Sequence, residues 1–140
     1  MKYFKTIIFT AFLILFNSCS SSFISLENGK KIDTRLVGTW VGSEKDQQIE
    51  GIEKEWEMIR NADGTFILHF VMRQNGISYP SIEEGNWWVQ NGFFYEFHED
   101  SGKADFYNYK ILNHKQVRFI SKSIGVDMNT DDYSFIDTKK

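Results

Sequence analysis

The sequence predicts an all-β domain of seven or eight short antiparallel strands that follow one another as an up-and-down meander and close into a small barrel. Its aromatic residues, 4 Trp, 6 Tyr and 13 Phe, stand largely in short runs where apolar and polar residues alternate. There is one proline, turn signals recur at close spacing, and no apolar pattern of helical period extends over an ordinary helix length. Strands joined by tight hairpins bury one face best by closing, which also removes the edges of the sheet.

The first three strands are predicted from alternation alone. One strand is expected near Leu36–Ser43, and a second covers residues 53–60, where Trp56 and Met58 face away from three glutamates. Residues 65–73 carry the strongest local pattern in the chain, because every second residue is apolar. The apolar face of this third strand comprises Phe66, Leu68, Phe70 and Met72.

The later strands are predicted from hairpin signals. Residues 77–90 indicate a short strand, a break at Pro80 and a further strand through the two adjacent tryptophans. Asn91-Gly92 predicts a tight hairpin, because these two residue types accept the positive φ of a type I′ turn. The remaining strands are expected within residues 93–98, 104–113, 114–123 and 131–137.

The N-terminus predicts export. Two lysines precede an apolar stretch at residues 7–16, which is too short to span a bilayer and has the length of a signal-peptide core. The following Phe16-Asn17-Ser18-Cys19 resembles the lipobox of bacterial lipoproteins, although Phe16 stands where leucine is usual. The resemblance implies cleavage before Cys19 and acylation of that cysteine, which would anchor the protein to the lipid bilayer. An ordinary cleaved signal and an uncleaved anchor are the alternatives.

Three regions follow from this interpretation: a lipoprotein signal peptide at 1–18, a flexible tether at 19–34 and the barrel domain at 35–140. Ser20 after the cysteine favours the outer membrane by resemblance, and the near absence of acidic residues behind it favours a periplasm-facing domain. Loss of Lys2 and Lys5 with the leader lowers the basic count from 16 to 14 against 19 acidic residues, a net charge of −5. An acidic domain is unsuited to nucleic acid, so none is expected as a partner.

A family resemblance begins at Gly38-Thr39-Trp40. This G-x-W at the start of a strand, followed by a meander, resembles the lipocalin-like domains of bacterial lipoproteins. The resemblance implies that Trp40 closes one end of the barrel against an arginine from a late strand, for which Arg118 is the candidate by position. It also implies a ligand held inside a cup.

Aromatic side chains on the predicted inner face could line such a cup or simply fill it, and both interpretations stay open. The choice between Trp88 and Trp87 is also open. The candidate ligand-binding residues are Trp56, Phe66, Phe70, Trp88, Tyr95, Phe97 and Tyr109.

No enzyme chemistry is predicted. The three histidines are isolated from one another and from Cys19, so no metal site is expected. The acidic run from Asp127 lacks the glycine and the final glutamate of a calcium loop, and no serine has a recognisable catalytic partner. We therefore expect no catalytic residue and no cofactor.

Two functions remain. The first is a non-catalytic, membrane-anchored lipoprotein whose barrel could hold a small apolar or amphipathic ligand. The second is a periplasmic interaction protein, such as a toxin-neutralising immunity protein or an envelope accessory factor, that offers an acidic face to a basic protein partner. That face would comprise Glu44, Asp46, Glu50, Glu53, Glu55 and Glu57.

Overall fold

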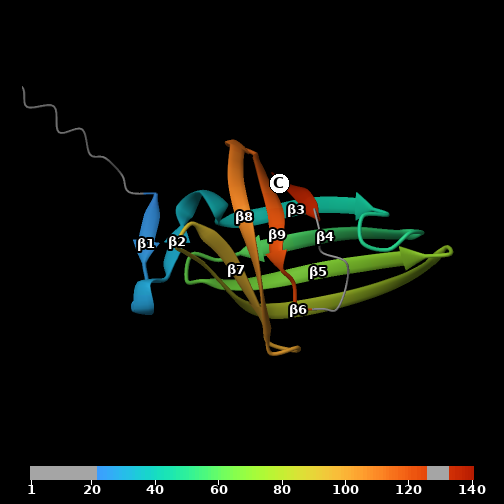
Figure 1. Ribbon diagram of the computed structural model, residues 1–140, viewed down its shortest axis with the longest axis horizontal. Coiled ribbons are helices and arrows are strands. Elements are labelled where there is room, and N and C mark those ends of the chain that lie inside the picture. The colour runs from blue at the N-terminus through green and yellow to red at the C-terminus, as the bar shows by residue number, and fades with distance from the viewer. Residues whose placement is uncertain (1–21, 126–132) are drawn as a thin grey trace, which may run out of the picture.

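The computed structural model describes residues 22–125 and 133–140, and these form a closed antiparallel β-barrel (Figure 1). Eight strands, β3 to β10, each pair with the next along the chain, and β10 pairs with β3 to close the ring. This eight-stranded meander confirms the predicted fold class. The barrel strands are β3 (Gly38–Lys45), β4 (Ile52–Arg60), β5 (Thr65–Gln74), β6 (Ile77–Gln90), β7 (Phe93–His98), β8 (Lys103–Asn113), β9 (Gln116–Ser123) and β10 (Ser134–Lys139).

The described part of the expected tether differs from the prediction. Residues 22–36 contain the short strands β1 (Phe23–Ser25) and β2 (Lys31–Asp33), and β2 pairs with β6 at Val89. Two 3-10 turns, η1 (Glu27–Gly29) and η2 (Thr34–Leu36), complete the segment. It packs onto the barrel because Ile32 and Leu36 are apolar and become fully buried there.

The hairpins and the single proline follow local chemistry. Asn91 and Gly92 both have positive φ, 51° and 82°, as the predicted type I′ turn between β6 and β7 requires. The expected break at Pro80 is wrong, because β6 runs through it and Pro80 pairs with Val71. Residues 77–84 of β6 pair with β5 but not with β7, whose pairing starts at Gly85, so the missing N–H of proline disturbs no second ladder.

One end of the barrel is packed solid and the other is hollow. Around Trp40 the interior is filled by fully buried side chains that include Phe94, Val117 and Phe119. Toward the opposite end, β4, β5 and β6 extend beyond the shorter β7, and β8 and β9 cross them (Figure 1). This arrangement leaves space inside the barrel on the side of the long hairpins.

Candidate functional site

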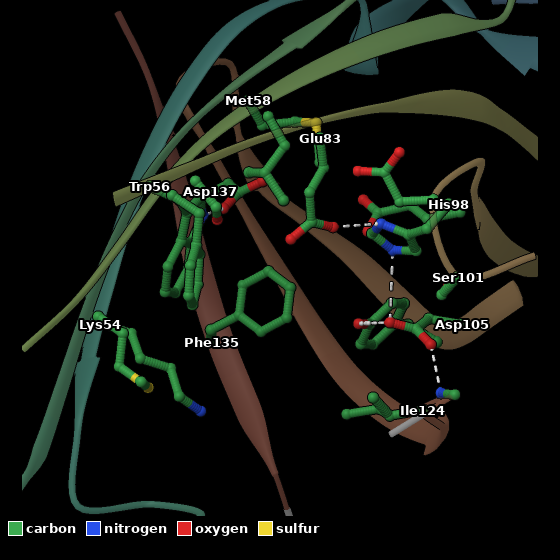
Figure 2. A pocket seen from close by; sticks show the side chains of 18 of the residues that line it. Lys54, Trp56, Met58, Glu83, His98, Ser101, Asp105, Ile124, Phe135 and Asp137 are labelled. Atoms are coloured by element: carbon green, nitrogen blue, oxygen red, sulfur yellow. Dashed lines mark hydrogen bonds and ion pairs between the residues drawn. The ribbon is translucent and has the colours of Figure 1, made fainter. Parts of the chain in front are cut away.

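A cavity of about 470 Å³ occupies the hollow end of the barrel (Figure 2). Its size is within the range of pockets that bind small molecules. Six apolar side chains from β4, β5 and β10 form what we call the apolar wall: Trp56, Met58, Leu68, Phe70, Met72 and Phe135. One side of the cavity is therefore suited to contact with a hydrocarbon group.

Trp56 is held in the apolar wall by contacts at its ring and at its nitrogen. Its indole lies over Gly42 on β3, where a Cβ atom would come within 2.4 Å of the ring. Its Nε1 donates a hydrogen bond to Asp137 Oδ1 at 2.8 Å, and its ring meets Phe135 edge-on with 5.1 Å between centroids. A glycine opposite a tryptophan thus fixes the orientation of the largest ring in the wall.

A buried ion pair lies at the floor of the cavity. Arg60 Nη2 donates to Asp137 Oδ2 at 2.7 Å, and both residues are almost wholly buried. The guanidinium carbon also lies 5.0 Å from the Phe94 ring centroid and 5.1 Å from that of Phe119. Asp137 therefore serves both Arg60 and Trp56, and joins β10 to β4.

The polar side of the cavity is what we call the His98 cluster, formed by His98, Glu83, Glu96 and Asp105. Figure 2 shows His98 between Glu83 and Asp105, with Nδ1 at 2.8 Å from Glu83 Oε2 and Nε2 at 3.5 Å from Asp105 Oδ2. Glu96 Oε2 lies 3.9 Å from the same Nε2. Asp105 also accepts hydrogen bonds from the backbone N–H of Gly125 and from the Tyr107 hydroxyl.

The His98 cluster shifts the titration of its members. Burial raises the pKa of Glu96 to about 7, although the charges of Arg60 and His98 oppose that shift. Burial by itself would lower the pKa of His98, but Asp105 and Glu83 outweigh it and raise the pKa to about 10. At neutral pH the imidazole is therefore an imidazolium ion.

A second ion pair lies at another part of the cavity rim. Lys54 Nζ is 2.8 Å from Glu44 Oε1 and also donates to Gln48 Oε1. Both charged side chains are buried, and the ammonium faces the Tyr133 ring at 5.5 Å. Burial beside Glu44 raises the pKa of Tyr133, so its hydroxyl stays neutral.

Four of the seven predicted ligand-binding residues point inward, and two of these border the cavity. Trp56 and Phe70 border the cavity. Phe66 and Tyr109 also point inward but do not border it, because Phe66 packs edge-on against His98 and the Tyr109 hydroxyl donates to Asp33 Oδ2 at 2.9 Å. Burial raises the pKa of Tyr109 to about 12. The inward position of these four follows the alternation of β4, β5 and β8.

The inward position expected for Trp88, Tyr95 and Phe97 is wrong. Pairing of Trp87 with Glu96 and of Val89 with Phe94 puts those residues inside, so their neighbours in sequence point out. Outside, Trp88 stacks on Tyr95 with 5.2 Å between centroids. The Lys30 ammonium lies 3.7 Å from the Trp88 ring centroid, and Tyr95 also stacks on Phe106.

The residues predicted to close the barrel are also only partly in place. Gly38 begins β3 with φ +124°, and Trp40 is buried at the packed end. Arg118 is wrong for the closing role, since it is exposed and pairs outside with Ile136 and Lys110. Arg60 and Lys139 face the Trp40 ring instead, at 6.0 and 5.3 Å.

The predicted acidic face is less available than its composition indicates. Glu44 is buried beside Lys54, so its expected exposure is wrong. The three predicted acidic residues that lie in β4 each have a cationic neighbour. These pairs are Glu53 with Lys45, Glu55 with Arg73 and Glu57 with Lys140.

Sequence reasoning missed the whole polar half of the cavity, namely the His98 cluster together with Arg60 and Asp137. In β7 every second residue is aromatic, namely Phe93, Tyr95 and Phe97. The alternation therefore predicts these residues on the inner face, whereas they lie on the outer one. One feature of the sequence could have predicted the polar side of the cavity. It is a charged residue at a position of β4 where the alternation places apolar residues on the inner face. Arg60 follows Trp56 and Met58 in the same alternation, and a buried arginine needs inward carboxylates.

Within residues 22–125 and 133–140, no helix is long and apolar enough to cross a membrane, and no cluster of three or more His, Cys, Asp or Glu residues is arranged to hold a metal ion. Cys19 and the predicted signal peptide lie outside the described residues, as does the acidic run from Asp127. In comparisons with known proteins, no family model matches the chain, and no curated protein matches it. The barrel itself is compatible with a lipocalin-like domain.

Proposed function

We propose that this chain is a membrane-anchored, periplasm-facing lipoprotein whose lipocalin-like barrel binds a small amphipathic ligand and catalyses no reaction. The observation that carries the ligand is the cavity of about 470 Å³, which has the apolar wall on one side and charged groups on the other. The anchor is supported by the leader and by Cys19 in the sequence.

A ligand accounts better for this interior than a filled core does. The 18 aromatic side chains that follow the leader would suffice to fill a small barrel, yet several of them, including Trp88, Tyr95 and Phe106, stack on the outside. At the hollow end the inward side chains border the cavity and do not fill it. Apolar walls with a few convergent polar groups are typical of small-molecule sites.

Native mass spectrometry of the protein purified from its own membrane tests both parts of the proposal. We expect a protein mass that begins at an acylated Cys19, together with a bound small molecule that is released on activation. Met72→Trp, which places a larger ring in the apolar wall, should lose the small molecule. Val71→Trp, which adds the same ring on the outward face of β5, should keep it.

The two parts fail separately in that measurement. A protein that retains its leader or carries no acyl group would overturn the anchor. A protein without any small molecule, or one whose small molecule is unaffected by Met72→Trp, would overturn the ligand cavity.

A further inference from the structure

Carboxylates outnumber cations around the cavity. Among the described residues, five acidic side chains border it, against two basic side chains and the His98 imidazolium. The acidic residues are Glu83, Glu96, Asp100, Asp105 and Asp137, and the cationic ones are Lys54, Arg60 and His98. The lining therefore carries an excess of negative charge in a place with restricted access to water.

Each cation already has a carboxylate partner at short distance. Arg60 is bound to Asp137 at 2.7 Å, and Lys54 lies 2.8 Å from Glu44, which does not itself border the cavity. His98 is bound to Glu83 at 2.8 Å. The two cations nearest Glu96, Arg60 and His98, are thus each shared with a nearer carboxylate.

In the part of the protein that the structure describes, Glu96 is held only by two long ion pairs. It is 5% exposed and borders the cavity, yet within the described part of the chain its side chain accepts no hydrogen bond. Its nearest cationic atoms are Arg60 Nη2 at 3.5 Å and His98 Nε2 at 3.9 Å. A buried carboxylate without a donor is unfavourable, so a donor brought in by a ligand would be bound there.

An anionic ligand is disfavoured by the position of Arg60. Two of its nitrogens, Nε and Nη1, and the nearby His98 Nε2 have no hydrogen-bond partner in the described structure, but all three are buried. The rings of Trp40, Phe94 and Phe119 lie against the guanidinium, so an anion could reach Arg60 only from the cavity, where Asp137 already holds Nη2. It would also approach Glu96 and Asp137, which repel it.

We infer that the ligand of this barrel is an amphipathic amine, whose ammonium group binds the Glu96 carboxylate while its hydrocarbon lies along the apolar wall. The inference rests on the proposed ligand-binding function and adds the chemical class of the ligand. Burial raises the pKa of Glu96 to about 7 despite the nearby charges of Arg60 and His98, which agrees with a carboxylate that these two cations compensate only in part.

Calorimetric titration with three probes of equal chain length tests the inference. The full-length protein is reconstituted in phosphatidylcholine nanodiscs, and titration into empty nanodiscs supplies the blank. The probes are octylamine, octanol and octanoate. We expect octylamine to bind about 10- to 100-fold more tightly than octanol, as one charge-assisted hydrogen bond allows, and octanoate to bind most weakly.

Glu96→Gln keeps the shape of the side chain and removes its charge. We expect this variant to lose about 10-fold or more of its octylamine affinity and to keep its octanol affinity, which also shows that the variant is folded. The matched control is Glu84→Gln, which removes the same charge from the outer face of β6 and should leave both affinities unchanged.

The outcomes separate the two levels of the proposal. If octanol binds as tightly as octylamine, or octanoate binds most tightly, the amine is overturned while the ligand-binding barrel stands. The same holds if Glu84→Gln weakens octylamine as much as Glu96→Gln does. If none of the three probes binds above the nanodisc blank, the ligand-binding function itself is overturned.

Discussion

At the scale of single residues, Glu96 and His98 are the side chains whose chemistry depends most on their position. They stand on the same face of β7, two residues apart, and share the interior with Arg60, Asp105 and Asp137. Burial disfavours the charged form of both side chains, but in the described structure only His98 has an oppositely charged partner at hydrogen-bonding distance. One residue is consequently an imidazolium ion and the other is a carboxylate near its titration point.

Stability is expected to fall as pH rises, because both groups hold protons more tightly in the folded chain. The pKa of Glu96 rises from 4.5 to about 7, so its contribution is complete below about 4.5 and is lost as pH rises through 7. This loss is on the order of 3 kcal/mol. The pKa of His98 rises from 6.5 to about 10, so its contribution is lost over that higher interval.

Thermal unfolding followed by circular dichroism between about pH 5 and pH 9 measures this dependence. Glu96→Gln should flatten the decrease below pH 7 and leave the decrease above it, since His98 keeps Glu83 and Asp105 as partners. A melting temperature that rises with pH over this interval would contradict the assignment of both groups.

At the scale of elements, β4, β5 and β7 could all be predicted as strands, but the inner face could be predicted only for β4 and β5. Trp56, Met58 and Phe70 lie on one face because apolar and polar residues alternate around them. In β7 aromatic residues occur on both faces, and the face that carries Glu96 and His98 is the inner one, where Glu96 lies near Arg60 and His98 lies near carboxylates of other strands. These ion pairs join different strands, and β4 and β7 are far apart in the sequence. The alternation of residues within a single strand therefore cannot predict them.

The pair of Arg60 and Asp137 is expected to be the most sensitive link between elements. Asp137→Ala leaves a buried guanidinium without its carboxylate and Trp56 without its acceptor, so we expect a loss of about 3–5 kcal/mol. Urea unfolding measures it. The control is Glu55→Ala, which breaks the exposed pair with Arg73 and should cost less than about 1 kcal/mol.

Replacing the pair together distinguishes a charge effect from a loss of packing. The double variant Arg60→Met, Asp137→Leu removes both charges and should recover much of the stability lost in Asp137→Ala. Equal losses in Asp137→Ala and Glu55→Ala would show that the buried pair does not stabilise the link between β4 and β10.

At the scale of the whole molecule, the meander and its closure follow from the sequence, whereas the hollow end does not. Tight hairpin signals such as Asn91-Gly92 predict neighbouring strands, and a closed barrel removes their edges. Whether the interior is full depends on how far β4, β5 and β6 extend past β7, which the sequence pattern does not determine. Trp88 and Tyr95 stack on the outside of the barrel. The sequence predicts them inside, so the interior holds less aromatic volume than expected.

Methyl NMR of the methionines tests the ligand cavity most directly. Met58 and Met72 both border it, and Met58→Leu and Met72→Leu assign their signals in protein labelled at the methionine methyl groups. On titration with octylamine, we expect both signals to shift together and to saturate at one equivalent, with Glu96→Gln requiring a higher concentration. Signals of Met58 and Met72 that stay unchanged, or drift without saturating, would contradict a ligand site inside the barrel.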